Sequence, residues 1–443
     1  MKNENNGGIL PTCLAYLRNP GKINRDSDAY RFLKRINYID DDAIDECLIK
    51  NRLAVIRLLC EFDDVFQIPA IHAPGAYFWG GLISLERFGL DDHGIRRFGV
   101  GGRGVNLQRA VESCAGEAAE FISFLRIEGD CRVVDHADPA GFSKEDLDWI
   151  QSFINSGKKR EIDPSGWVKA ISLPENAEVY FPVDLILRSS QGARTINSIT
   201  ESTGVGAGAT RQQAIASGFL EVLERDAVAL WWYGGNKGKR LSGNFLNESG
   251  LSFFAEKIRR NSPRPWWLLD ITSDIGIPAV ISVSSESDGK SVVAGSSSDF
   301  TIIDAAKGAF LEMCQMEFAR EISLARKQIK PASELNEIDH MWIDRSERLS
   351  VNNYPELIGV KSQQKEMNHK TIDLDHAVGK MKSGGITTYV SELTRKDIGI
   401  PVFRTIIPQL QSSKVRVITR RLENTAEKNG ADLSETLKKP TII

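Results

Sequence analysis

The sequence predicts an α/β or α+β fold, because short β-branched and aromatic runs alternate with segments that repeat apolar residues every three or four positions. Glycine-rich stretches lie between several of these segments, as expected where strands and helices follow one another closely. The chain has 443 residues, of which 41% are hydrophobic. This length and composition allow one large domain or two to three ordinary domains with ample core.

Helical periodicity is found early in the chain, where residues 29–33 and 53–60 place apolar side chains on one helical face. Strands are expected further on, in runs that are rich in β-branched and aromatic residues. The expected strands are residues 178–181, 185–187, 267–269, 279–283, 388–390 and 402–407.

Two later segments have a different composition. Residues 327–384 are rich in charged and amide side chains, and we interpret them as a surface excursion or helical insertion. The segment after Leu410 is expected to be weakly helical. We therefore divide the chain into an N-terminal region (1–95), a central domain (96–412) and a C-terminal tail (413–443). The N-terminal region carries no assignable motif, and it is either a docking site for a partner or a structural flank.

The charge balance excludes several function classes. Lysine and arginine number 56 against 59 aspartates and glutamates, which gives a formal net charge of −3. Without a basic field the chain is not expected to bind a nucleic-acid backbone. No apolar run approaches the roughly 20 residues of a membrane span, and the polar start at residues 1–6 lacks the apolar core of a signal peptide. We expect a cytoplasmic protein with no nucleic-acid or membrane partner.

The cysteines and histidines show no metal-binding spacing. The six cysteines contain no C-x-x-C pair, and the six histidines contain neither H-x-x-E-H nor H-x-x-x-H. Cys114 and Cys314 fall within helical patterns and are expected to be buried as small apolar residues.

An internal repeat is the most informative feature of the chain. Each copy has an alanine, then a small residue, a glutamate, and a glutamate or glutamine, at spacings that fall on one face of a helix. The copies are Ala110/Ser113/Glu117/Glu120, Ala214/Ser217/Glu221/Glu224 and Ala305/Gly308/Glu312/Gln315. Gly104 and Gly208 precede the first two copies at equal distance, and residues 294–298 precede the third.

A single pair of spaced glutamates is most simply a solvated helix face, but the second copy resists that interpretation. Between residues 214 and 233 almost everything is apolar or small outside the polar stripe of Ser217, Glu221, Glu224, Arg225 and Asp226. Buried carboxylates require cations, hydrogen-bond donors or a raised pKa. If the three helices converge, Mg²⁺ is the natural counter-charge, since it takes one or two carboxylates together with substrate phosphates.

Glycine-rich loops at the starts of these helices would supply backbone N–H donors for the phosphates. The repeat therefore predicts a nucleotide–magnesium site built from three helices. Neither familiar phosphate fingerprint is present: G-x-x-x-x-G-K-[ST] does not occur, and residues 204–208 do not spell G-x-G-x-x-G.

These motifs resemble those of the YcaO-domain family, in order over residues 96–412. Residues 202–208 followed by 221–227 resemble the family's central signature. Residues 102–104, with Ser113, Glu117 and Glu120, resemble its first ATP motif, and residues 312–317 resemble its third. Residues 389–394 and 401–408 resemble its C-terminal strands. The resemblance implies a YcaO-type α/β fold with mixed sheets and three helices that converge on ATP and Mg²⁺.

The resemblance also implies roles for individual residues. Glu221, Glu224 and Arg225 would be catalytic. The metal ligands would be Glu117, Glu120, Glu221 and Glu224. The nucleotide would contact these glutamates and Arg103, Ser113, Ser202, Ser217, Arg225, Glu312, Gln315 and Arg404.

The chain departs from the family pattern at four places. Phe121 stands where an arginine usually follows the first Glu-x-x-Glu, Ala209 replaces a common asparagine, and Gly308 replaces a frequent arginine. Many azoline-forming relatives end in Pro-x-Pro-x-Pro, whereas this chain has the single Pro440 near its end.

By resemblance the chain is an ATP-dependent cyclodehydratase that forms thiazolines or oxazolines from Cys, Ser or Thr of a ribosomally made precursor peptide. Such domains usually act with a separate ThiF-like partner that binds the leader peptide, and homodimerisation is left open. Two alternatives stay open as well: a thioamide-forming YcaO enzyme, and a non-catalytic ATP-binding accessory subunit.

Overall fold

The computed structural model describes residues 6–39, 46–90, 97–127, 129–135, 141–156, 166–188, 201–361 and 372–443. The chain folds into two compact units. Unit 1 comprises residues 1–69, 77–219 and 388–406, and unit 2 comprises residues 70–76, 220–387 and 407–443. These units do not coincide with the three functional regions proposed from the sequence, which stay a prediction. Residues 1–5 of the polar N-terminus lie outside the described ranges.

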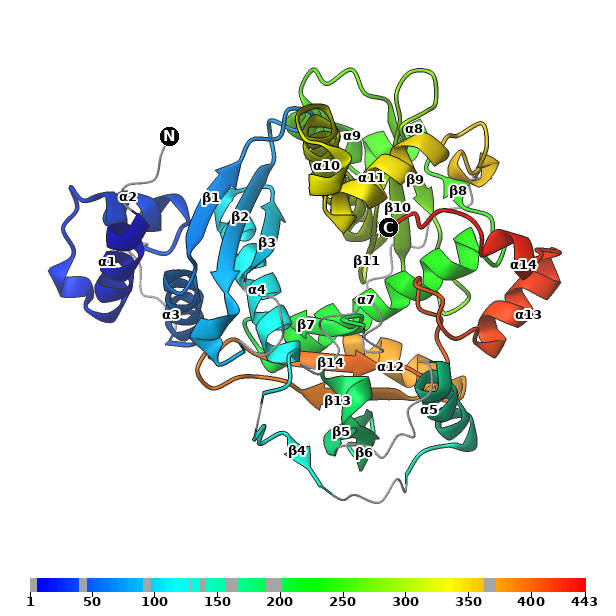
Figure 1. The fold of residues 1–443 in the computed structure, drawn as a ribbon, viewed down its shortest axis with the longest axis horizontal. Coiled ribbons are helices and arrows are strands. Elements are labelled where there is room, and N and C mark those ends of the chain that lie inside the picture. Colours follow the sequence, from blue (N-terminus) through cyan, green and yellow to red (C-terminus); the bar gives the residue numbers. More distant parts are fainter. Residues whose placement is uncertain are drawn as a thin grey trace. The chain divides into compact units, whose positions relative to one another are not determined.

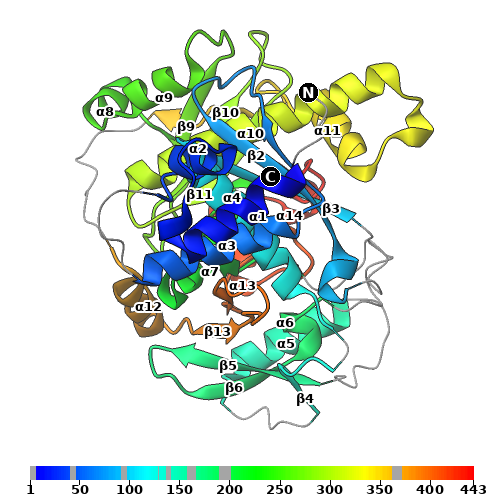
Figure 2. The ribbon, with the colours of Figure 1, turned by 90° about the vertical axis from the view of Figure 1, so that its left-hand side faces the viewer.

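Unit 1 begins with three helices (Figure 2): α1 (Asn6–Arg18), α2 (Asp28–Arg35) and α3 (Glu46–Cys60). Helix α1 packs against both α2 and α3. Ser27 begins α2 because its side chain accepts a hydrogen bond from the Tyr30 N–H. Ala29 and Leu33 are buried on one face of this helix, and Ile56 of α3 is fully buried. The helical periodicity predicted for residues 29–33 and 53–60 is confirmed.

An antiparallel sheet of order β1-β2-β3 follows, with β1 at Asp64–Ile68, β2 at Tyr77–Ser84 and β3 at Arg97–Gly104. Helix α4 (Leu107–Phe124) begins at Asn106, whose side chain accepts from the Arg109 N–H. The glycine-rich stretch before the first repeat is therefore a strand and not the loop that the sequence suggested. The other two strands of this sheet, β1 and β2, come from the N-terminal region.

A six-stranded sheet completes unit 1, in the order β4-β5-β13-β14-β7 with β6 paired to β5. The strands are β4 (Val133–Val134), β5 (Trp167–Leu173), β6 (Glu178–Pro182), β7 (Val205–Ala207), β13 (Thr388–Glu392) and β14 (Val402–Ile406), and α5 spans Lys144–Ser156. The strands predicted at 178–181, 388–390 and 402–407 are confirmed. The strand predicted at 185–187 is wrong, because helix α6 (Val183–Ile186) occupies this run after Pro182. A short apolar run does not distinguish a buried strand from a buried helical turn.

Helix α7 (Arg211–Trp232) begins in unit 1 and continues into unit 2. Unit 2 contains a five-stranded sheet of order β11-β10-β9-β8-β12 (Figure 1). Its strands are β8 (Lys239–Arg240), β9 (Trp266–Asp270), β10 (Ala279–Ser284), β11 (Val293–Ser298) and β12 (Val360–Lys361). The strands predicted at 267–269 and 279–283 are confirmed. Helix α10 (Ile302–Ile329) begins at the cap Thr301 and buries Ala305, Ala309 and Met313.

The other helices of unit 2 are α8 (Gly243–Glu248), α9 (Leu251–Arg259), α11 (Glu337–Arg348), α12 (Leu374–Ser383), α13 (Arg420–Asn429) and α14 (Leu433–Thr436). Single turns of 3₁₀ helix lie at Pro20–Lys22, Leu85–Phe88, Ala332–Glu334 and Pro355–Leu357. Residues 327–384 contain the expected helices in their described part. They are more than a surface excursion, since β12 joins the sheet and Trp342 and Leu357 are buried. The predicted helical tail is confirmed by α13 and α14.

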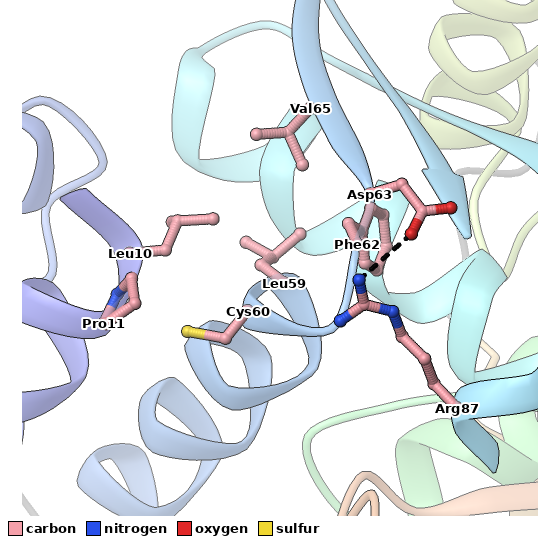
Figure 3. A pocket seen from close by; sticks show the side chains of 8 residues that line it. All are labelled: Leu10, Pro11, Leu59, Cys60, Phe62, Asp63, Val65 and Arg87. Atoms are coloured by element: carbon pink, nitrogen blue, oxygen red, sulfur yellow. Dashed lines mark hydrogen bonds and ion pairs between the residues drawn. The ribbon is translucent and has the colours of Figure 1, made fainter. Parts of the chain in front are cut away.

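A cavity of about 270 Å³ lies in unit 1 between α1, α3 and β1. Figure 3 shows Leu10 and Pro11 facing Leu59 and Cys60, with the Asp63–Arg87 ion pair at one end. None of the predicted site residues lines it.

Cys114 and Cys314 are 0% and 1% exposed, as predicted, and burial raises the pKa of both thiols. Among the described helices, none has the length and apolar character needed to span a membrane.

Candidate functional site

The first repeat copy is a strand–helix pair in unit 1. Strand β3 lies so close to α4 that a Cβ on Gly102 would be 2.0 Å from the Ala110 carbonyl oxygen, so only glycine fits there. This approach brings the backbone of β3 within reach of the helix side chains. The Gly101 N–H donates to Glu117 Oε2 across 2.9 Å.

The second copy begins with the same contact. A Cβ on Gly206 of β7 would be 2.5 Å from the Ala214 carbonyl oxygen of α7. The Ala207 N–H of β7 donates to Oε1 of Glu120, on α4, across 2.7 Å. In unit 1 the two glutamates of the first copy are thus each held by a backbone amide of a glycine-rich strand.

The third copy pairs β11 with α10 in unit 2. A Cβ on Gly295 would be 2.2 Å from the Met313 N, which again requires glycine. The Ser296 N–H donates to Glu312 Oε2 across 3.0 Å. This bond spans 16 residues of chain, as does the bond from Gly101 to Glu117 in the first copy. In the first and third copies a strand amide therefore fixes a glutamate of the helix that follows, whereas the strand amide of the second copy fixes a glutamate of the first copy's helix.

Unit 2 gathers three carboxylates around one arginine. Arg225 lies 3.4 Å from Glu221 and 3.9 Å from Glu224, and the Ser296 hydroxyl donates to Glu224 across 2.6 Å. Burial lowers the pKa of Arg225, but the charges of Glu224, Glu221 and Glu312 more than offset this and raise it. Arg225 therefore stays charged among these three carboxylates.

Asp226, the next residue, does not join this group. It is fully buried and accepts hydrogen bonds from the Gln411 N–H and from Arg421. Burial raises the pKa of Asp226 to about 6 although Arg421 lowers it. Asp226 was grouped with the polar stripe in the sequence, and the structure gives it different partners.

The predicted site residues fall into two sets. Those in unit 2 are Glu221, Glu224, Arg225, Glu312 and Gln315, and those in unit 1 are Arg103, Ser113, Glu117, Glu120, Ser202, Ser217 and Arg404. Ser113, Ser202 and Ser217 are exposed. Arg404 is 7% exposed, donates to the Ile186 carbonyl and lies over the Phe124 ring, so part of its guanidinium is engaged inside unit 1.

The departures from the family pattern have structural counterparts. Phe121 stacks on Phe98 with ring centroids 4.0 Å apart, which adds packing between α4 and β3 where a charge would stand. A Cβ on Gly308 would be 2.4 Å from the Ser297 hydroxyl, so α10 has no room for an arginine without movement of β11. The Ala209 N–H donates to Gln213 Oε1.

Sequence reasoning missed the backbone amides and Ser296. The glycine-rich stretches were expected to be loops that offer free N–H groups to phosphates. Instead Gly101, Ala207 and Ser296 direct their N–H groups to Glu117, Glu120 and Glu312. The signal that could have found Ser296 is the run of serines at 296–298, which follows the third glycine.

The donor set of unit 2 fits Mg²⁺. Three carboxylates lie around one guanidinium, and carboxylate oxygens are ligands that a hard cation such as Mg²⁺ takes. Within the described ranges no three Asp, Glu, His or Cys side chains form a ready-made metal cluster. In proteins Mg²⁺ usually takes one or two carboxylates and completes its shell with water and phosphate oxygens.

Comparison with known proteins decides the family. The family model for YcaO cyclodehydratases, described as ATP- and Mg²⁺-binding, matches residues 101–411. The chain belongs to the YcaO family. ATP and Mg²⁺ are its cofactors, as they are for the family. Arg421, the partner of Asp226, lies beyond the matched residues.

Solved structures show the same fold. A heterocyclase in complex with substrate and cofactor has a TM-score of 0.61 and 21% identity; the match covers 88% of this chain and 55% of that one. This chain thus spans little more than half of that protein's length. YcaO from Methanopyrus kandleri, bound with AMPPCP and Mg²⁺, has a TM-score of 0.57 and 17% identity over 87% and 91% of the two chains. The E. coli microcin synthetase McbBCD complex with pro-MccB17 bound contains a chain with a TM-score of 0.54 and 13% identity, over 78% and 88%.

Proposed function

We propose that this YcaO protein is an ATP-dependent cyclodehydratase that forms thiazoline or oxazoline rings from Cys, Ser or Thr of a ribosomally made precursor peptide. The observation that carries the proposal is the group of Glu221, Glu224 and Glu312 around Arg225. Such a group can hold a divalent cation and still present one guanidinium to phosphate oxygens. The family membership makes ATP the source of those phosphates.

In this reaction a Cys, Ser or Thr side chain of the peptide attacks the preceding carbonyl carbon, and the former amide oxygen must leave. ATP, when bound with Mg²⁺, supplies the phosphoryl group that makes this oxygen a good leaving group. Arg225, which neighbouring carboxylates keep protonated, would stabilise negative charge on phosphate oxygens. Glu221 and Glu224 would be the metal ligands of unit 2.

Fixed hydrogen bonds keep the carboxylates in place. Ser296 restrains Glu224 through its hydroxyl and Glu312 through its N–H. In unit 1 the amides of Gly101 and Ala207 restrain Glu117 and Glu120, the other two proposed ligands. Electrostatic stabilisation is most effective when the groups that provide it do not need to reorganise.

The peptide substrate and its delivery are part of the proposal. The McbBCD synthetase is a complex with pro-MccB17 bound, and one of its chains is similar in fold to this chain. By analogy we propose that this chain acts with a separate ThiF-like protein that binds the leader peptide. The N-terminal region is the proposed docking site for that partner.

The test is reconstitution of the chain with a candidate precursor peptide, a ThiF-like partner and Mg·ATP, followed by mass spectrometry of the peptide. Loss of one water per ring, dependent on ATP, is the expected result. Replacement of oxygen by sulfur in the presence of sulfide would instead identify a thioamide-forming enzyme. ATP binding without partner-dependent hydrolysis or peptide modification would identify an accessory subunit. The control is Glu221→Gln/Glu224→Gln, which should leave the peptide unmodified.

A further inference from the structure

Asp226 follows Arg225 on α7 but faces away from the proposed ligands. At roughly 100° per residue, its side chain is rotated by about 140° from Glu221 and about 160° from Glu224. It is 0% exposed, and nothing in the proposed chemistry uses it. A buried carboxylate on the back of a functional helix needs a reason, because its desolvation opposes folding.

Two contacts hold this carboxylate. The Gln411 N–H donates to it across 3.0 Å, and the Arg421 Nε lies 3.0 Å from both of its oxygens. Gln411 also closes its own segment: its Oε1 accepts from the N–H and hydroxyl of Thr419, which caps α13. The segment from Gln411 to Thr419 is therefore fixed against α7. Helix α13 follows directly, and this places its Arg421 beside Asp226.

Arg421 reaches a second carboxylate as well. Both of its terminal nitrogens donate to Asp274, in the connection between β9 and β10. Strand β10 pairs with β11, and β11 carries Ser296, which donates to Glu224 on the other face of α7. Hydrogen bonds thus link both faces of α7 to this sheet. On the Asp226 face the link runs through Arg421 to Asp274, and on the Glu224 face it runs through Ser296.

We infer that Asp226 and Arg421 are positioning residues for the carboxylate face of α7, and that α13 thereby sets the affinity of unit 2 for Mg·ATP. The inference rests on the proposed function. It concerns a helix that the family match does not reach. Without Arg421, the described contacts leave only the Gln411 amide to hold Asp226. Helix α7 then loses its link to Asp274 and keeps the Ser296 bond and its apolar packing on the sheet.

The test is calorimetric titration of the full-length protein with Mg²⁺ and β,γ-methylene-ATP, which is not hydrolysed between the β- and γ-phosphates. Arg421→Gln and Asp226→Asn should each weaken binding at least about tenfold, or about 1.4 kcal/mol. The double variant should be no weaker than either single variant, because the pair acts as one unit. Arg421→Lys should recover part of the affinity, since it keeps the charge but lacks the planar fork. Arg420→Gln, an exposed neighbour on α13, should bind like wild type.

A folded Arg421→Gln variant with wild-type affinity would overturn the inference, even if its melting temperature is lower, because the pair would then be purely structural. If this variant does not fold, wild-type affinity of Arg421→Lys together with wild-type affinity of Asp226→Asn overturns it. Absence of nucleotide binding by the wild type contradicts the proposed function instead. In that event amide hydrogen exchange tests the positioning role by itself. Arg421→Gln should accelerate exchange over residues 293–298 relative to Arg420→Gln. Equal exchange rates would refute the link from Asp226 through Arg421 to the sheet.

Discussion

Ser296 donates its hydroxyl to Glu224 across 2.6 Å and its backbone N–H to Glu312 across 3.0 Å. One strand residue, itself fully buried, therefore orients one glutamate from each of two helices, α7 and α10. Glu224 and Glu312 are therefore held in position by the strand and not only by their helices.

The first prediction concerns this serine. Ser296→Ala keeps the N–H bond to Glu312 and removes the donor to Glu224, and hydrogen bonds to charged groups contribute about 1.5–3 kcal/mol. We expect Mg·ATP binding weaker by about one to two orders of magnitude, measured by calorimetry. Ser298→Ala is the matched control, because Ser298 lies on the same strand and donates to the Pro278 carbonyl. Equal affinities of the two variants would contradict a role for Ser296 in the site.

Two glycines should respond in opposite ways to alanine. A Cβ at position 102 would overlap the Ala110 carbonyl of α4, so Gly102→Ala should destabilise unit 1 by about 1–3 kcal/mol or more. Gly379 lies within α12 with nothing near its Cβ position, so Gly379→Ala should stabilise by about 0.5–1 kcal/mol. Thermal and urea unfolding measure both changes. A Gly102→Ala variant as stable as the wild type would contradict the close strand–helix approach.

Glu317 is the centre of a buried ion network in unit 2. It is 2% exposed, forms two bonds to Arg259 at 2.7 and 2.8 Å, and accepts from Arg264 at 3.1 Å. Glu317→Gln leaves two buried guanidinium groups without this charge and should lower the free energy of unfolding by about 3–5 kcal/mol. The exposed pair Asp288–Lys290 is the control, since Asp288→Asn should change the free energy of unfolding by about 1 kcal/mol or less. If Glu317→Gln lowered the free energy of unfolding no more than the control does, the ion network would not be important for stability.

Thiol reactivity should depend on pH and on burial. Cys60 is half-buried, and burial, with a smaller contribution from Glu61, raises its pKa to about 11. Because the thiolate is the reactive form and a raised pKa delays its formation, about one Cys60 in a thousand is ionised at pH 8. Iodoacetamide should therefore modify the exposed Cys131 first. The Cys60 rate should rise about tenfold per pH unit towards pH 10. Peptide mapping that finds equal rates at pH 8 would contradict this.

The three helices and their carboxylates could be predicted because helical spacing is a local property of the sequence. Residues 110–120, 214–224 and 305–315 carry the same stripe, and each lies within a helix. The burial of Cys114 and Cys314 followed from the same periodicity. The resemblance of these motifs to those of YcaO proteins predicted the family, and the family match over residues 101–411 confirms it.

The strands β3, β7 and β11 could not be predicted, since glycine and serine have low strand propensity and the pairing that makes them strands is non-local. Their glycines are needed because the helix packs against the backbone itself. The bond from Ser296 to Glu224 joins residues 72 positions apart, and no local pattern indicates it. The same holds for Asp226 and Arg421, 195 positions apart.

The most direct test of the account is calorimetric titration of Mg·ATP into wild-type protein and into Glu221→Gln/Glu224→Gln. Glu248→Gln/Glu256→Gln, which removes the same charge from two exposed residues of unit 2, is the control. We expect saturable binding by the wild type and the control, and none by the folded Glu221→Gln/Glu224→Gln variant. Binding by that variant with wild-type affinity, or no binding by folded wild-type protein, would contradict the claim that the α7 carboxylates hold the nucleotide and its metal.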